Sequence, residues 1–350
     1  RPDKTEEIAF SFQTQGHVRL YVDGKEVASG LNMKSARAYA MPVEAGKEYQ
    51  IKVAYVATEG DCASLNFDLG REIPLNLSAS VNRVKDADVI IFAGGISPQL
   101  EGEEMPVKIR GFRGGDRETI ELPSIQTALL KALKKAGKKI VFVNFSGSAM
   151  ALTQETELCD AMLQAWYPGQ AGGEAIAKTL FGEYNPAGRL PLTFYRSTSQ
   201  LPDFEDYSLK GRTYRYFKGT PLFHFGHGLS YTNFEYGNAR LSASSIKAGE
   251  TLTVTIPVSN IGARDGEEVV QVYLRRPGDK EGPSHALRGF KRVAIAKGNT
   301  TDVEIALSPE DFEWFDTETN TMRQLEGEYE ILYGGTSDVN KLKKTSITIE

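Results

Sequence analysis

Three glutamates lie close together in the segment GGISPQLEGEEMPVKIRGFRGGDRETIELP, at Glu101, Glu103 and Glu104. Neighbouring carboxylates disfavour each other's ionisation, so one of them can keep its proton closer to neutral pH. A proton held in that range suits a general acid. The pattern by itself leaves two other interpretations open, a solvated acidic loop and a cation site. Further charged residues follow in the same segment, at Arg110, Arg113, Asp116 and Arg117.

The position of this segment strengthens the chemical interpretation. It follows DADVIIFAGG, a continuous apolar run ending in glycines that is typical of a buried parallel strand. Loops longer than roughly 12 to 15 residues are uncommon and often functional. Open α/β sheets place their ligands at the carboxyl ends of the strands. The sequence therefore predicts that this loop carries the chemistry.

Other motifs carry weaker signals. PGQAGGEAIA lacks the Lys-Ser/Thr of a phosphate-binding loop, so it predicts tight strand-to-helix packing. NFSGSAMAL lacks the GxSxG spacing, which disfavours Ser146 and Ser148 as nucleophiles. Cys62 and Cys159 are interpreted as free thiols, with a single disulfide as the alternative. No metal or cofactor is predicted, since no metal-ligand spacing occurs among the histidines His17, His224, His227 and His285.

The periodicity of apolar residues changes along the chain. Residues 1–72 alternate apolar and polar positions and contain the hairpin dipeptide Asp23-Gly24, so three or four strands are expected. Residues 73–205 combine apolar strand runs with a helical pattern in LPSIQTALLKALKKAGKK, which predicts an α/β layer with a largely parallel sheet. GRLPLTFY, residues 188–195, is predicted to be a further strand of this layer.

The last part of the chain returns to a period of two. Residues 206–235 are irregular and rich in Gly, Tyr and Phe, and RTYRYF within them is expected to clamp neighbouring domains together. Residues 236–350 contain strands separated by turns and predict an immunoglobulin-like β-sandwich. Four aromatic residues of this part are expected to be buried: Phe290, Phe312, Trp314 and Phe315.

Composition excludes some classes of protein. The chain has 350 residues with 46 acidic and 41 basic side chains, a formal net charge of −5. This balance disfavours nucleic acid as a partner. No apolar run reaches the roughly 18 residues that a membrane span needs. The chain begins at Arg1 rather than Met, and we expect it to be part of a longer protein.

Several of these segments, in this order, resemble the C-terminal part of glycoside hydrolase family 3, which includes β-glucosidases and β-xylosidases. They are DADVIIFAGGISPQLEGEEM, GGDRETIELPSIQTALLKAL, WYPGQAGGEAIAKTLFGEYNPAGRLPLTF and RTYRYFKGTPLFHFGHGLSYTNFEY. VRLYVDGKEV with VEAGKEYQIKVAY resembles the later strands of a PA14 domain. GEEVVQVYLRRP, LRGFKRV, DFEWFD and GEYEILYGGTSD resemble a fibronectin type III-like domain.

The resemblance implies a multidomain α/β plus all-β protein. A partial PA14-like β domain (1–72) precedes an α/β sandwich with a mostly parallel sheet (73–205). A linker (206–235) then leads to a fibronectin type III-like, immunoglobulin-like β-sandwich (236–350).

The resemblance also implies the chemistry, that of a retaining β-glycosidase acting on an oligosaccharide or β-glycoside. The acid/base is expected at Glu101, with Glu103 and Glu104 as alternatives. The Asp nucleophile and most of the sugar pocket are expected in an N-terminal (β/α)8 barrel outside this chain, so the chain alone is expected to be inactive. Substrate-binding residues are not predicted.

The resemblance implies that the parent protein is periplasmic or extracellular. It is also compatible with a homodimer. A non-catalytic carbohydrate-binding or structural module is the alternative function.

Overall fold

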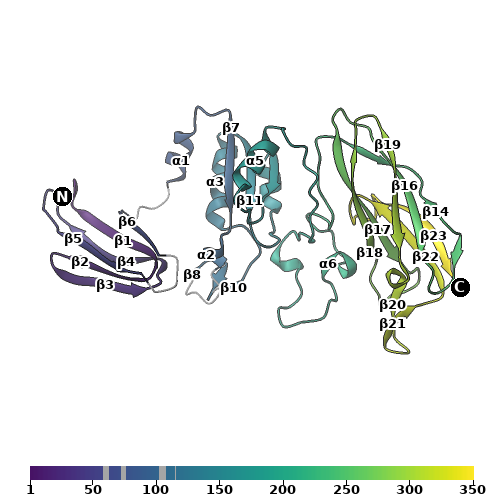
Figure 1. Cartoon of the computed structure of the whole chain (residues 1–350). Coiled ribbons are helices and arrows are strands. Elements are labelled where there is room, and N and C mark those ends of the chain that lie inside the picture. The colour runs from purple at the N-terminus through teal and green to yellow at the C-terminus, as the bar shows by residue number, and fades with distance from the viewer. Residues whose placement is uncertain (58–62, 72–75, 102–107, 115) are drawn as a thin grey trace. The chain divides into compact units, whose positions relative to one another are not determined.

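The computed structural model describes residues 1–350 except for 58–62, 72–75, 102–107 and 115. Glu103, Glu104 and Cys62 therefore lie outside the described residues. The chain divides into two compact units, Arg1–Arg83 and Val84–Glu350, and each is described by itself (Figure 1). None of the helices in the described ranges is long and apolar enough to cross a membrane.

The first unit consists of two three-stranded antiparallel sheets, in the orders β4-β1-β6 and β3-β2-β5. The described part of this unit holds six strands where three or four were expected, and KSARAYAMPV, which forms β4, was not among the predicted strands. The elements are β1 (Glu6–Gln15), β2 (His17–Val22), β3 (Lys25–Leu31), β4 (Lys34–Val43), β5 (Ile51–Val56), β6 (Ser64–Gly70) and the helix α1 (Leu77–Arg83).

Alternation along β1 and β2 builds a shared core for the two sheets. Successive strand residues point to opposite faces, so every second residue faces inward. Asp23 and Gly24 have φ angles of 48° and 82°, the left-handed pair that a tight hairpin between β2 and β3 requires. The predicted hairpin is confirmed. The buried core residues are Phe10, Phe12, Val18, Leu20 and Val22.

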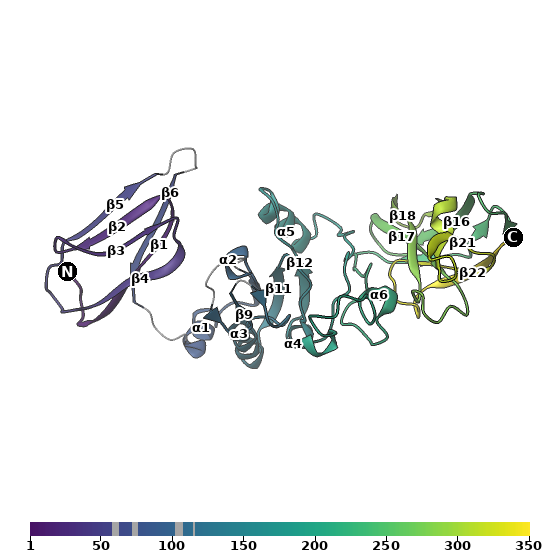
Figure 2. The same ribbon diagram turned by 90° about the horizontal axis from the view of Figure 1, so that it is seen from below.

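The second unit begins with a parallel three-stranded sheet in the order β12-β11-β7. Figure 2 shows α5 on one side of these strands and α3 with α4 on the other. The predicted parallel sheet and the predicted helices are confirmed. The elements are β7 (Val89–Gly95), α2 (Pro98–Glu101), α3 (Ser124–Lys135), β11 (Lys139–Phe145), α4 (Thr153–Leu158), β12 (Ala161–Gln164) and α5 (Gly172–Leu180).

The charged loop after β7 is partly structured in the described residues. It contains three two-residue strands paired in the order β10-β9-β8, namely β8 (Lys108–Ile109), β9 (Phe112–Arg113) and β10 (Asp116–Arg117). This small sheet turns the loop back toward the carboxyl ends of the parallel strands.

The predicted strand GRLPLTFY is wrong. Residues 188–195 form a single bridge, between Phe194 and Phe223. The Leu190 and Phe194 N–H groups donate to the carbonyls of His227 and Phe223 at 2.8 and 2.9 Å. Pro191 lies between them and has no N–H to donate, so a continuous ladder cannot form. This connection also contains a 3-10 turn, η1 (Thr198–Gln200), and the short helix α6 (Thr213–Tyr216).

The described remainder of the unit consists of two β-sheets around one core, together with the two-stranded hairpin β20-β21. One sheet has the order β13-β16-β14 with β19 beside β16, and the other has the order β15-β23-β22-β17-β18. The elements are β13 (Phe234–Tyr236), β14 (Arg240–Leu241), β15 (Ser245–Ile246), β16 (Leu252–Asn260), β17 (Gly266–Arg275), β18 (Ala286–Ile295), β19 (Thr300–Leu307), η2 (Pro309–Phe312), β20 (Glu313–Asp316), β21 (Thr321–Gln324), β22 (Gly327–Gly334) and β23 (Lys343–Ile349).

Of the four aromatic residues expected in this core, two are buried and two are exposed. Phe312 and Trp314 are buried, at 0% and 3% exposure, as predicted. Phe290 and Phe315 are 67% and 51% exposed, so their predicted burial is wrong. Strand alternation explains the second case, because Trp314 points inward and its neighbour Phe315 must point outward. Phe290 lies on β18, the edge strand of the larger sheet.

Candidate active site

The candidate site lies where the three parallel strands end. β7 and β11 run in register up to Gly95 and Phe145, and β12 ends beside Asn144. Gly95 has a φ of 127°, and a Cβ there would lie 1.9 Å from the Phe145 carbonyl oxygen. Only glycine therefore fits this turn. The chain then enters α2, whose last residue is Glu101.

Glu101 contacts Tyr167, which lies three residues beyond the end of β12. The Tyr167 hydroxyl donates to Glu101 Oε2 at 2.9 Å. Burial and this hydrogen bond raise the pKa of Tyr167 to about 12, so the phenol keeps its proton and remains a donor. Among the residues that the structure describes, no second hydrogen bond to the Glu101 carboxylate is found.

Two backbone features place the Tyr167 ring. Trp166 has a φ of 56°, a left-handed conformation that is strained for a large residue and is often found at functional sites. Gly147 passes under the ring, since a Cβ at this position would lie 2.7 Å from Tyr167 Cε2. The loops after β11 and β12 therefore fit together only with a glycine at 147.

Arg117 is the cation of this cluster. Its Nη1 donates to the Ser148 hydroxyl at 2.7 Å, and its Nη2 is buried without a partner among the described residues. Burial lowers the pKa of Arg117, while the charge of Glu101 acts in the opposite direction. A guanidinium with a free N–H beside a carboxylate suits an oxygen-rich ligand.

A buried amide network supports the loop after β11. Asn144 Nδ2 donates to Gln164 Oε1 at 2.6 Å and to Ser146 Oγ at 3.1 Å. The Ser146 hydroxyl is fully buried and donates to the Ser148 carbonyl at 2.9 Å. Both serines thus take part in the hydrogen bonds of this loop, and that neither is a nucleophile stays a prediction.

The other charged residues of the predicted loop are not drawn into this cluster. Arg113 is solvent-exposed and pairs with Glu118 at 3.0 Å. Arg110 and Asp116 are also exposed. Of the described charged residues that the sequence singled out, Glu101 and Arg117 come together. Whether clustered carboxylates shift a proton equilibrium stays a prediction, because two of the three glutamates lie outside the described residues.

Sequence reasoning missed Tyr167 and Glu121. The signal for Tyr167 was the WYPG motif directly after a strand, where a side chain reaches the ligand edge of the sheet. Glu121 accepts from the Thr198 N–H at 2.9 Å and from its hydroxyl at 2.5 Å. Burial opposes its ionisation, yet these hydrogen bonds lower the pKa of Glu121 overall. Glu121 therefore joins the end of the charged loop, through hydrogen bonds to Thr198, to the connection that follows α5.

No cluster of three or more His, Cys, Asp or Glu residues that could hold a metal occurs in the described ranges. His227 stacks on Phe223 with ring centroids 5.2 Å apart. His224 lies 3.8 Å from Asp338. His227 thus packs against a residue of its own loop, and His224 faces the connection between β22 and β23.

Cys159 is a free, partly buried thiol. Burial, followed by the charges of Glu155 and Asp160, raises the pKa of Cys159 to about 11. The thiolate is the reactive form, so we expect iodoacetamide at pH 8 to modify Cys159 roughly 100-fold more slowly than an ordinary exposed thiol. Peptide mass spectrometry over time measures the rate, and the urea-unfolded chain serves as control. Modification at the rate of the unfolded chain contradicts this prediction.

Comparison with known proteins gives consistent matches over the chain. Residues 14–231 match the glycosyl hydrolase family 3 C-terminal domain, and residues 268–337 match the fibronectin type III-like domain. A xylan 1,4-β-xylosidase of Xylanibacter ruminicola is 48% identical over 98% of this chain and 40% of its own length. A periplasmic β-glucosidase of Salmonella typhimurium is 34% identical over 67% of this chain and 31% of its own.

A solved structure covers the whole chain. The β-glucosidase of Kluyveromyces marxianus in complex with glucose has a TM-score of 0.76 and 25% identity, over 100% of this chain and 44% of that one. The chain thus spans less than half the length of these relatives.

Proposed function

Because the chain belongs to glycosyl hydrolase family 3, we propose that it forms the C-terminal portion of a retaining β-glycosidase that removes terminal β-linked xylose or glucose. In this proposal Glu101 is the acid/base, with Glu103 and Glu104 as alternatives. The observation that carries it is the Glu101–Tyr167–Arg117 cluster at the carboxyl edge of the parallel sheet.

The proposed chemistry needs two carboxyl groups about 5 to 5.5 Å apart. An Asp of the N-terminal barrel attacks the anomeric carbon, and Glu101 gives its proton to the leaving oxygen. Glu101 then takes a proton from the water that hydrolyses the glycosyl-enzyme intermediate. Tyr167 holds Oε2, so Oε1 is the oxygen we assign to proton transfer. The Arg117 N–H group that has no partner among the described residues suits a sugar hydroxyl beside it.

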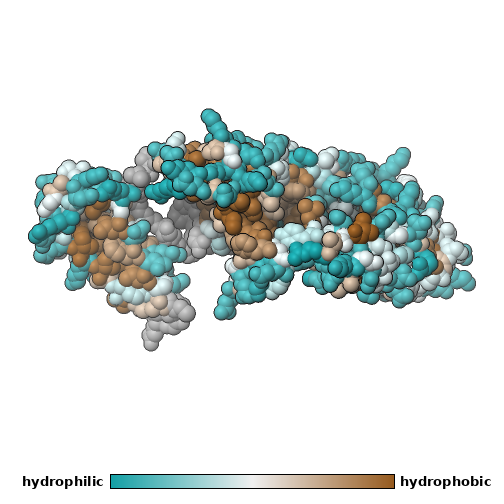
Figure 3. Space-filling model, turned by 90° about the horizontal axis from the view of Figure 1, so that it is seen from above, coloured by the Kyte–Doolittle hydropathy of each residue, from teal (hydrophilic) through white to brown (hydrophobic). Residues whose placement is uncertain are grey.

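The exposed surface of β7 supports a role for protein outside this chain. Parallel strands are normally covered on both faces. β7 is an edge strand, and its Val89 and Ile91 are 49% and 53% exposed. Figure 3 shows apolar surface on the second unit as well as on the first. We propose that the barrel-bearing portion of the parent protein completes this layer.

We further propose the domain boundaries stated from the sequence, with a partial PA14-like domain at 1–72, an α/β sandwich at 73–205, a linker at 206–235 and a fibronectin type III-like β-sandwich at 236–350. The two sheets around one core at 234–349 support the last of these. The periplasmic relative supports a periplasmic or extracellular location. A homodimer stays a prediction.

We expect the isolated 350-residue chain to release no nitrophenol from aryl β-xylosides or aryl β-glucosides. One carboxylate cannot carry out the double displacement. The full-length parent protein, assayed in parallel, is expected to turn over at least one of these substrates.

Two outcomes overturn the proposal. One is hydrolysis by the isolated chain at the full-length rate, with Glu101, Glu103 and Glu104 all dispensable. The other is a full-length protein that binds oligosaccharides in calorimetry but hydrolyses none, with binding unchanged when all three glutamates are replaced by Gln. The latter favours the non-catalytic binding module.

A further inference from the structure

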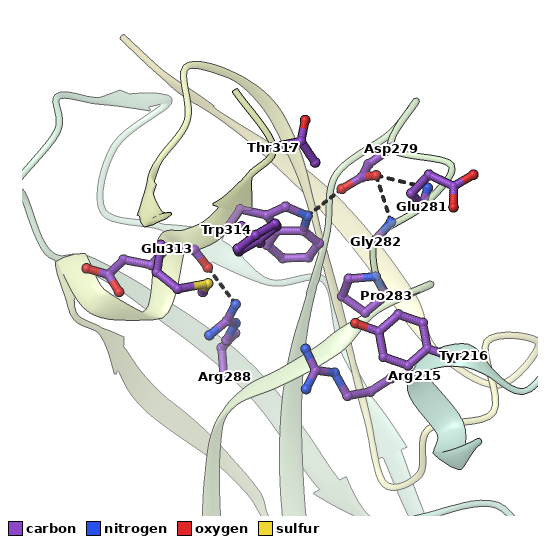
Figure 4. A pocket seen from close by; sticks show the side chains of 12 residues that line it. Arg215, Tyr216, Asp279, Glu281, Gly282, Pro283, Arg288, Glu313, Trp314 and Thr317 are labelled. Carbon is purple, nitrogen blue, oxygen red and sulfur yellow. Dashed lines mark hydrogen bonds between the residues drawn. The ribbon is translucent and has the colours of Figure 1, made fainter. Parts of the chain in front are cut away.

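A pocket lies between α6 and the β20–β21 hairpin beside the C-terminal sheets. Its volume is about 220 Å3, and none of the residues of the Glu101 cluster lines it. Figure 4 shows the guanidinium groups of Arg215 and Arg288 beside the Trp314 indole and the Tyr216 ring. Arg215 and Tyr216 belong to the RTYRYF segment that stood out in the sequence. The pocket is the size of a site for one small ligand group rather than a drug-sized one, for which roughly 300 Å3 or more is typical.

The two arginines share the pocket lining with acidic residues but pair with none of those that the structure describes. Neither guanidinium forms an ion pair with a described carboxylate, and both Nε atoms are buried without a hydrogen-bond partner. Figure 4 shows the two guanidinium groups near each other. Burial lowers the pKa of Arg288 and the charge of Arg215 lowers it further, while the charge of Asp311 acts in the opposite direction. Two adjacent cations with buried, unused N–H groups favour an anion.

The acidic residues at the rim have other roles. Asp279 accepts from the Trp314 indole N–H at 2.6 Å and from the Gly282 N–H at 2.8 Å, so its two oxygens are engaged. Glu313 contributes its backbone carbonyl, which accepts from Arg288 Nη2 at 2.7 Å. Figure 4 shows the side-chain carboxylates of Glu281 and Glu313 directed away from the arginines.

Ring surfaces and apolar side chains complete the pocket. The Arg288 guanidinium lies 5.5 Å from the Trp314 ring, and Arg215 lies 5.5 Å from the Tyr216 ring. Phe315 and Met322 also line the pocket and are each 51% exposed. The aromatic rings can contact an apolar ring face of a ligand, and the two planar guanidinium groups can bind its carboxylate.

We propose that this pocket binds a uronic acid, a sugar carrying a carboxylate, with Arg215 and Arg288 holding the carboxylate and the aromatic side chains contacting the ring. That the ligand is a sugar rests on the proposed glycosidase function. That it carries a carboxylate follows from the two arginines, which form no ion pair with a described residue. The bidentate geometry of guanidinium and carboxylate gives the preference for this anion. Inorganic phosphate is the competing anion that the test must separate.

The test is a ligand-observed NMR titration of the intact 350-residue chain at low salt with four probes: glucuronate, glucose, acetate and inorganic phosphate. We expect saturable binding of glucuronate, about tenfold weaker binding of acetate and of phosphate, and no binding of glucose. Arg215→Gln and Arg288→Gln are each expected to weaken glucuronate binding about tenfold or more. Arg240→Gln, an exposed arginine of the same part of the chain that pairs with Asp302, is the matched control and should change nothing.

Arg215→Gln keeps the test decisive if Arg288→Gln does not fold, because no hydrogen bond of the Arg215 guanidinium to a described residue is lost. No glucuronate binding to the native chain overturns the proposal. So does phosphate binding as tight as glucuronate binding, or glucuronate binding that survives Arg215→Gln. None of these outcomes depends on hydrolysis, so each is separate from failure of the proposed glycosidase function.

Discussion

Glu101→Gln in the full-length protein is expected to lower kcat by about 100- to 10,000-fold on aryl β-glycosides with poor leaving groups. The loss arises because the departing oxygen no longer receives a proton. Activated substrates such as dinitrophenyl glycosides need little protonation, so glycosylation by the variant should be nearly normal with them. Steady-state kinetics across a series of leaving groups measures the difference.

The same series separates the candidate glutamates. Glu103→Gln and Glu104→Gln are tested in parallel, and a leaving-group-dependent loss in one of them instead of Glu101 moves the acid/base role to that position. Glu118→Gln is the matched control, because Glu118 belongs to the same loop but pairs with the exposed Arg113. The assignment to Glu101 is wrong if Glu101→Gln behaves like Glu118→Gln.

Arg189→Ala is expected to destabilise the second unit by about 3 to 5 kcal/mol. Arg189 Nη2 lies 3.0 Å from Glu268 Oε1, and the side chains are only 8% and 7% exposed. Removal of the arginine leaves a buried carboxylate of β17 without its cation. Urea unfolding followed by tryptophan fluorescence measures the change in the free energy of unfolding. The adjacent exposed pair Arg292–Glu267 is the matched control, and Arg292→Ala should cost no more than about 1 kcal/mol.

The effect of Arg189→Ala should depend on pH. Burial raises the pKa of Glu268 in the folded state, and Arg189 acts against that rise. A carboxyl with a raised folded pKa stabilises the fold most below its unfolded pKa, and this contribution disappears as pH rises through the folded value. The variant lacks the opposing cation, so its deficit should be largest at neutral pH and shrink toward pH 4. A deficit independent of pH would show that lost packing, not the uncompensated charge, causes the destabilisation.

Much of the fold could be predicted because its signals are local. The apolar runs of β7 and β11 and the turn Asp23-Gly24 each determine a nearby backbone conformation. The wrong predictions concern strand pairing and side-chain exposure, which depend on residues distant in the sequence. Pro191 interrupts the ladder that GRLPLTFY was expected to join, and the exposure of Phe290 depends on β18 being the edge of its sheet.

The candidate site shows the same division. The acidic loop and its position after a parallel strand could be recognised from residue types and order, and so could Arg117 as a charged neighbour. The contacts that Tyr167, Gly147 and Ser148 make could not, because these residues follow two other strands whose ends meet this loop only in the folded sheet.

By itself, the sequence determined the order of β, α/β and β segments, the family resemblance and the loop that carries three glutamates. Tertiary structure alone decided that Tyr167 bonds Glu101, that Arg189 and Glu268 form a buried pair, and that Arg215 and Arg288 share a pocket. The physical reason is that periodicity and turn chemistry act between neighbours in the chain. Hydrogen bonds, desolvation and charge act between side chains that only the folded backbone brings within a few ångströms of each other.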